Sequence, residues 1–208
     1  KPGDWSPKAS FVTGVIGEPW RGKWITDAEA STSPKGIGYH AGETNVDELK
    51  WVQVDLGQSM PINEVLLESP RHENHDGFGF PLRYRIEGSN DPDFGSPVMI
   101  ADRTRADVAS PGTKAVPHRA SATVRYVRVT ATKLFPWNGK FCFALSELRV
   151  RSGGKNVAVN RPVTFKDAVD NFGWHHAALT DGTGAEPRGM PVFKRGLLLD
   201  KEVREAVL

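Results

Sequence analysis

Residues 51–57 read Trp-Val-Gln-Val-Asp-Leu-Gly, and this stretch decides the fold. Its apolar residues Val52, Val54 and Leu56 alternate with polar ones, so they share one face of an extended chain. A period of two predicts a β-strand that turns one face toward a core. The alternation recurs at residues 82–87, 124–129 and 148–151, and further strands are predicted at 62–67 and 98–100.

Turn-forming residues separate these runs. The 208 residues include 21 Gly and 15 Pro, and no amphipathic helix pattern exceeds about two turns. We therefore expect an all-β protein, an antiparallel β-sandwich of the jelly-roll type with a short mixed C-terminal extension. The chain is expected to comprise an N-terminal segment at 1–34, the sandwich at 35–152, and an extension at 153–208 that leads into a truncated next β-domain. Gly153-Gly154 marks the expected boundary between the sandwich and the extension.

Composition excludes several classes of partner. A net charge of +2 is too small for a nucleic-acid binder, which needs a dense basic face. No stretch approaches the roughly 18 apolar residues of a membrane span, so membrane insertion is not expected. The single cysteine, Cys142, lies in the apolar run 141–144, where a buried structural thiol is expected, and it excludes an internal disulfide.

The acidic residues give no sign of catalysis. Glycoside hydrolysis needs two carboxylates roughly 5 to 10 Å apart across a cleft. The 25 acidic residues fall on outward strand positions or in turns, and no nucleophile-elbow or zinc-protease motif occurs. We expect no enzyme activity from this fragment.

Three predicted loops carry groups that suit a sugar. In the loop 71–81, Arg71 and His75 can hydrogen-bond to hydroxyls, as can His72 and Asn74 beside them. A tryptophan in the loop 134–140 can stack on a sugar ring. If the loops meet at one end of the sandwich, one shallow site contains Tyr39, His40, Arg71, His75 and Trp137. The alternatives are a solvated loop closed by Phe78 and Phe80, and Trp137 as a core anchor.

Four motifs resemble discoidin domains, also called coagulation factor V/VIII C-type or galactose-binding-like domains. They are residues 51–67, 84–91, 124–131 and 144–150, in the order and spacing of that family. The resemblance implies the jelly-roll fold and binding loops clustered at one end.

The flanks resemble another family. Residues 20–26 and 191–208 are similar to the N-terminal region of bacterial α-L-rhamnosidases. This resemblance implies an accessory module of a secreted, periplasmic or cell-surface bacterial glycoside hydrolase. Its expected partners are a weakly bound glycan and the catalytic domain of the parent chain.

The discoidin resemblance also implies one structural calcium ion. Sugar-binding members hold it with loop carbonyls, an early Asp and a Glu near the final strand. Glu147 stands at the matching place; Asp27 is a poor match because Ala28 follows it, and Asp181-Gly182 resembles the usual loop better. Asp27 and Glu147 are therefore the candidate metal ligands.

Two other functions stay open. The module can be a purely structural insertion that packs on the catalytic domain, since no Ser/Thr/Pro-rich tether occurs in 153–190. It can also be an adhesion module that binds protein or lipid. Phe78, Phe80 and Trp137 are few for a lipid-binding surface.

Overall fold

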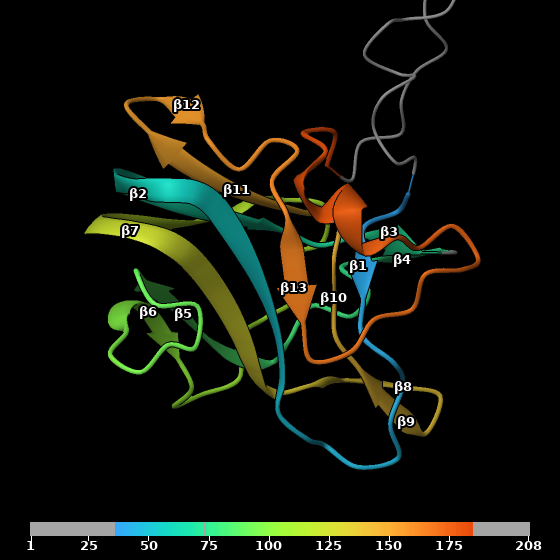
Figure 1. Cartoon of the computed structure of the whole chain (residues 1–208). Coiled ribbons are helices and arrows are strands. Elements are labelled where there is room, and N and C mark those ends of the chain that lie inside the picture. Colours follow the sequence, from blue (N-terminus) through green and yellow to red (C-terminus); the bar gives the residue numbers. More distant parts are fainter. Residues whose placement is uncertain (1–35, 73, 185–208) are drawn as a thin grey trace, which may run out of the picture. The chain divides into compact units, whose positions relative to one another are not determined.

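The computed structural model describes residues 36–72 and 74–184 (Figure 1). They belong to one unit, Ala28–Gly189. The predicted N-terminal segment with Asp27, and residues 185–208 of the predicted extension, lie outside the described residues. The described elements are β1 (Tyr39–His40), β2 (Lys50–Glu68), β3 (Arg71–His72), β4 (His75–Asp76), β5 (Arg83–Ser89), β6 (Val98–Arg103), β7 (Val116–Lys133), β8 (Phe135–Trp137), β9 (Lys140–Cys142), β10 (Ala144–Leu145), β11 (Glu147–Ser152), β12 (Lys155–Asn156), β13 (Val163–Phe165) and the 3-10 helix η2 (His176–Thr180).

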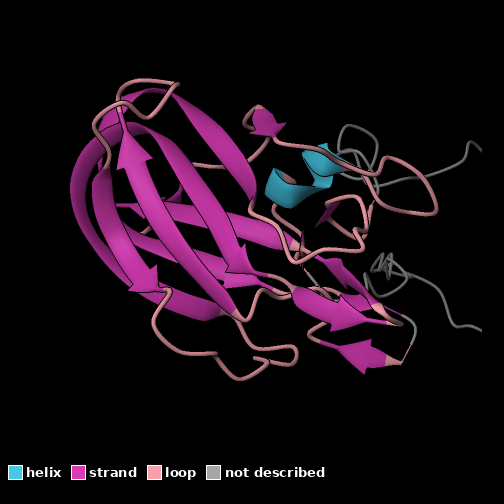
Figure 2. Cartoon of the chain, turned by 90° about the horizontal axis from the view of Figure 1, so that it is seen from below, coloured by secondary structure: helices cyan, strands magenta, loops and turns pink. Residues whose placement is uncertain are grey.

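One large sheet organises these strands, and the all-β antiparallel fold is confirmed. Its order is β12-β11-β2-β7-β5-β6, and β13 also pairs with β2. The long strands β2 and β7 pair from Lys50↔Ala131 to Leu67↔Val116. They curve together along their length (Figures 1 and 2), and β5, β11 and β13 pair with them, whereas β1–β10, β3–β4 and β8–β9 form separate two-stranded sheets.

The two halves of β2 pair with different strands. The first half of β2 pairs with β13, with Val54 opposite Val163. Its second half pairs with β11, with Leu67 opposite Leu148. The predicted strands at 51–57 and 62–67 are therefore one element, irregular where the register shifts between Asp55 and Met60.

The core contains the face that the alternation predicts. Val52, Val54 and Leu56 are fully buried. Gln53, which is on the other face, is also buried. The Arg128 guanidinium packs on it and donates two hydrogen bonds to its Oε1, which satisfies this buried polar group. Cys142 is buried as expected, and burial raises the pKa of its thiol to about 12, so the thiolate does not form near neutral pH.

The chain continues across the predicted boundary as strand. β11 turns back as β12, and β13 returns to β2. Residues 153–184 of the predicted extension thus pack on the sandwich, while the proposed division of the whole chain stays a prediction. Among the described residues, no helix is long and apolar enough to span a membrane.

We predict that a buried histidine makes the fold acid-sensitive. His118 is 4% exposed and lies 3.2 Å from the Tyr84 hydroxyl through Nε2. Burial, with the nearby Arg103 charge, lowers its pKa to about 4. The unfolded chain takes up this proton near pH 6.5, so the free energy of unfolding should fall by about 2–3 kcal/mol between pH 6.5 and 4.

Urea unfolding at several pH values measures this loss. His118→Gln should flatten the slope, because the variant has no buried imidazole to protonate. Equal slopes in the wild type and His118→Gln would contradict the assignment.

Candidate functional site

A cleft of about 430 Å³ opens where β1, the β3–β4 hairpin, the β8–β9 hairpin and the segment after β13 meet. These elements are far apart in the chain, and the pairing of β1 with β10 helps to gather them. The described lining residues are His40, Glu43, His72, Phe78, Trp137, Val169, Asn171, Phe172 and Trp174.

Aromatic rings form the floor of the cleft. His40, Phe78 and Trp174 are all buried. The His40 ring stacks on Phe78 with centroids 5.6 Å apart and lies 4.8 Å from Trp174. Burial lowers the pKa of His40, so its imidazole is neutral at physiological pH.

Two side chains build the walls. His72 lies 4.8 Å from the Phe78 ring and is half-buried. Trp137 meets Phe78 edge to face at 5.2 Å and is supported from behind by His75 at 4.6 Å. The β8–β9 turn fixes Trp137 at its place because Asn138 and Gly139 both have positive φ, the signature of a type I′ hairpin turn.

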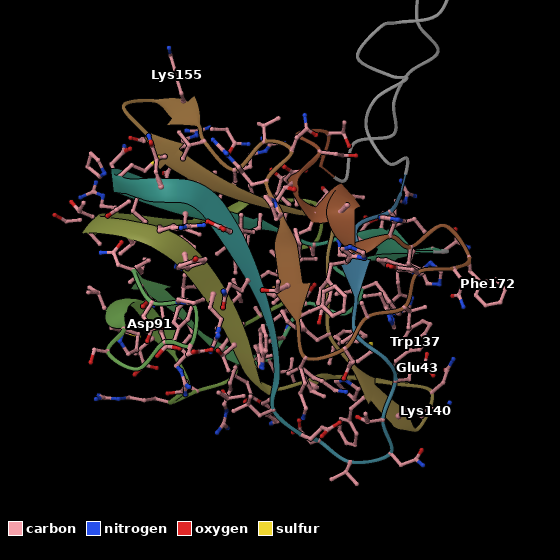
Figure 3. The ribbon with its side chains drawn as sticks, viewed as in Figure 1. Glu43, Asp91, Trp137, Lys140, Lys155 and Phe172 are labelled. Carbon is pink, nitrogen blue, oxygen red and sulfur yellow. The ribbon has the colours of Figure 1, made fainter. Side chains whose placement is uncertain are left out.

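The cleft carries little charge. Glu43 is the one Asp, Glu, Lys or Arg among the described lining residues, and the Lys140 ammonium lies 3.1 Å from its carboxylate. Figure 3 places Glu43, Lys140 and Trp137 on the same side of the molecule. The cleft therefore consists mainly of aromatic surface and of polar side chains that can hydrogen-bond to hydroxyl groups.

Residues 166–176, which we call the strap, form the remaining wall. Asp167 ties the strap down: its carboxylate accepts hydrogen bonds from Gly42 N at 2.8 Å and from the Lys50 ammonium. Its carbonyl accepts the Tyr39 hydroxyl. Val169 N donates to His40 O, so the strap runs directly beside the floor of the cleft.

The end of the strap is held by a second set of contacts. Asp170 accepts from His176 N at 2.9 Å and pairs with His176 Nδ1 at 2.6 Å. Ligand atoms of Asp170, His175 and His176 lie within 4.8 Å of one another, as a metal site requires. However, His175 Nδ1 accepts from Ala177 N, so these groups are already used as hydrogen-bond clamps of the strap.

The structure brings together some of the predicted site residues. His40 and Trp137 line the cleft, and His75 packs behind Trp137. Arg71 lies outside the lining and faces Asp76 at 3.3 Å, and Tyr39 is fully buried in the core. Sequence reasoning missed Phe172 and Trp174, because both follow the predicted end of the sandwich.

Glu147, the candidate calcium ligand, is fully buried. Its two carboxylate oxygens accept backbone N–H groups, from Gly182 at 3.1 Å and Gly184 at 3.2 Å. Calcium needs oxygen ligands around it, whereas converging N–H groups favour an anion. The Asp181 carboxylate is close enough to help raise the pKa of Glu147, so a second acidic group borders this site and the calcium ion stays a prediction.

A comparison with protein families finds one match. The model of the family described as "F5/8 type C domain" covers residues 12–148. This range includes β1 to β10 and the start of β11, and it ends before the strap. No curated protein matches the chain.

Three solved structures are similar to parts of the chain. A CBM32 module of Clostridium perfringens, in complex with GalNAc-β-1,3-galactose, is 19% identical, covers 51% of this chain and 68% of its own, and gives a TM-score of 0.39. CBM32-1 from a family 31 glycoside hydrolase of the same organism is 15% identical, covers 65% of this chain and 92% of its own, and gives a TM-score of 0.42. Chitosan-binding module 1 of a chitosanase/glucanase from Paenibacillus sp. IK-5 is 22% identical, covers 58% of this chain and 91% of its own, and gives a TM-score of 0.40.

Replacing Asp167 should loosen the strap. Asp167→Asn leaves the Lys50 ammonium, which is 3% exposed, with Glu48 as its remaining carboxylate partner. We expect the free energy of unfolding to fall by about 1–3 kcal/mol, measured by urea unfolding. Asp107→Asn is the control: Asp107 pairs with two cations, Arg83 and Lys133, but all three side chains are 36–43% exposed, so its loss should cost under about 1 kcal/mol. Equal losses would contradict the special role of Asp167.

Glu147 should destabilise the fold at alkaline pH. Burial, opposed in part by the two N–H donors, raises the pKa of its carboxyl to about 8. The folded chain therefore holds a proton that the unfolded chain releases near pH 4.5, so stability should fall by roughly 3–5 kcal/mol as pH rises from 4.5 to 8 and level off above pH 8.

Urea unfolding between pH 5 and 9 tests this dependence, with Glu147→Gln expected to flatten the slope. The unfolding temperature in millimolar CaCl₂ and in EDTA tests the predicted calcium ion. A rise with calcium that Glu147→Gln abolishes would support the calcium site, and no rise would contradict it.

Proposed function

Because the chain belongs to the F5/8 type C domain family, whose model covers residues 12–148, we propose that it is a non-catalytic module that binds an uncharged glycan. One observation carries this proposal: the cleft combines an aromatic floor and wall with side chains that hydrogen-bond to hydroxyls. The expected affinity is weak, because a shallow site offers few contacts to offset the ordering of the ligand.

The lining residues suit a sugar ring. A pyranose presents apolar C–H patches that pack on an aromatic face, and Trp137 offers such a face beside the ring of Phe78. Its hydroxyls need partners at the edges, which His72, Glu43 and Asn171 can supply. This mixture of stacking and hydrogen bonding supports a carbohydrate over a purely apolar ligand.

The charge of the cleft supports a neutral sugar. Lys140 offsets Glu43, and burial keeps His40 uncharged. An acidic sugar would meet the Glu43 carboxylate without an Arg among the described lining residues to balance it.

The same residues argue against hydrolysis. A glycosidase uses two carboxylates that face each other across the bond to be cleaved. Glu43 is the single carboxylate among the described lining residues. A binding role therefore suits this cleft better than a catalytic one.

The parent protein belongs to the proposal as well. The similarity of residues 20–26 and 191–208 to α-L-rhamnosidases supports an accessory module of a secreted bacterial enzyme of that kind. In this setting the module would hold the catalytic domain of the same chain close to its substrate.

A second function has one observation in its favour. Phe172 is 90% exposed, as an apolar side chain that enters a lipid surface would be. It is a single residue, however, whereas the cleft collects nine described side chains at one place. Adhesion to lipid is therefore the alternative that the binding experiments have to separate.

Heteronuclear NMR titration of the chain tests the proposal. The probes are L-rhamnose, D-galactose, N-acetylglucosamine, GalNAc-β-1,3-galactose and N,N′-diacetylchitobiose, and phosphatidylcholine vesicles with and without anionic lipid. Shifts are expected around His72 and Trp137 with at least one sugar. Silence with all sugars at high millimolar concentration would remove the proposal, and binding to vesicles alone would favour adhesion.

Trp137→Ala should weaken sugar binding about tenfold, corresponding to about 1.4 kcal/mol of lost stacking. The matched control is Trp51→Ala, because Trp51 stacks on Arg128 at 4.4 Å and does not line the cleft. Both variants are first checked for native chemical shifts. An equal effect of the two substitutions would contradict the site.

A further inference from the structure

The residue type at position 172, a phenylalanine, does not match its backbone conformation. It is 90% exposed, yet its backbone φ is +50°, in the left-handed region that bulky residues rarely adopt. Such strain concentrates at functional sites, where surrounding structure enforces it.

The cause of the positive φ is a tight turn. Trp174 N donates to Asn171 O at 2.8 Å, and the central residues Phe172 and Gly173 have φ of +50° and +87°. Positive φ at both central positions marks a type I′ turn, whose first central position favours Asn, Asp or Gly. The chemistry of the turn therefore gives no reason for a phenylalanine.

The turn is anchored on both sides of this residue. Gly173 O accepts from Ile37 N at 2.7 Å, and Trp174 packs into the floor of the cleft. Val169 N, earlier in the strap, bonds to His40 O. Phe172 is thus an exposed ring on a fixed support at the rim of the cleft (Figure 3).

We propose that Phe172 is a second stacking platform, which contacts the sugar next to the one that packs on Trp137. This inference rests on the proposed function. Trp137 is half-buried inside the cleft, whereas Phe172 is 90% exposed at its rim, and the two rings do not contact each other (Figure 3), so they offer two separate stacking faces to a ligand that extends from the cleft. The ligand class is accordingly an uncharged oligosaccharide of at least two residues.

The position of Phe172 in the chain gives this inference its second part. The family match ends at residue 148, and the strap begins at Lys166. The rim platform therefore comes from outside the region that defines the family. Specificity for longer ligands resides in the strap, which also supplies Trp174 to the floor, while His40, Phe78 and Trp137 lie within the family match.

Substitution at Phe172 separates the ring from the backbone strain. Phe172→Gly removes the ring and relieves the positive φ, so the midpoint of urea unfolding should be unchanged or higher. Phe172→Tyr keeps a ring with the same backbone. Asn160→Gly is the matched control, because Asn160 is also exposed, has a φ of +55°, and does not line the cleft.

Affinities are measured by NMR titration with D-galactose and N-acetylglucosamine, and with GalNAc-β-1,3-galactose and N,N′-diacetylchitobiose. Phe172→Gly should weaken disaccharide binding five- to tenfold and leave monosaccharide binding unchanged. Phe172→Tyr and Asn160→Gly should match the wild type with every probe.

The outcomes distinguish the two proposals. If the wild type binds sugars and Phe172→Gly binds them equally well, the platform is wrong and the glycan function stands. The same holds if Phe172→Gly loses the same affinity for monosaccharides as for disaccharides. A wild type that binds none of the sugars would remove both. If Phe172→Gly lost only its binding to phosphatidylcholine vesicles, Phe172 would be a lipid contact and the platform would be wrong.

Discussion

The cleft depends on one ion pair, between the buried Lys50 ammonium and the partly exposed Asp167 carboxylate. Lys50 begins β2 and is 3% exposed, so its ammonium has to be paired inside the protein. Asp167 supplies the pairing from the strap, and its second oxygen accepts Gly42 N, next to β1. A single carboxylate thereby joins a strand of the main sheet, the loop after β1 and the strap. Leaving the buried lysine without this partner is costly, and this cost holds the strap in one position.

The sandwich and the cleft place different demands on their residues. In the sandwich, β2 and β7 need only apolar side chains at alternate positions, so many sequences suffice. The cleft needs a defined ring at each position: Phe78 below, Trp137 on its hairpin and Trp174 at the end of the strap. The two tight turns with positive φ at both central residues, the β8–β9 hairpin turn at 138–139 and the strap turn at 172–173, set the directions of Trp137 and Trp174. Recognition is thus a property of short turns fixed to a rigid sheet.

The sequence predicts the sheet better than the cleft, for a physical reason. Val52, Val54 and Leu56 could be identified as core because alternation is a local property, whereas the burial of Gln53 depends on Arg128, 75 residues away in the chain. Trp137 and His40 could be selected by their chemistry and their places in loops. Tyr39 looked equally suitable, but its side chain points to the opposite side from His40, toward Phe143 in the core. Phe172 and Trp174 could not be placed, because their approach to the cleft rests on long-range bonds such as that from Val169 N to His40 O.

The pairing of β2 with β7 also determines how the chain must fold. Their contacts join Lys50 to Ala131 at one end and Leu67 to Val116 at the other, so the central pair of the sheet forms only after a long segment has closed into a loop. Strand β5 pairs with β7, and β13 pairs with β2, also across long stretches of chain. A topology rich in such distant contacts folds slowly, over milliseconds to seconds for domains of this kind. The strap adds one more long loop to close, because Asp167 and its partner Lys50 are 117 residues apart in the chain, so the wall of the cleft carries the same kind of entropic cost as the sheet that supports it.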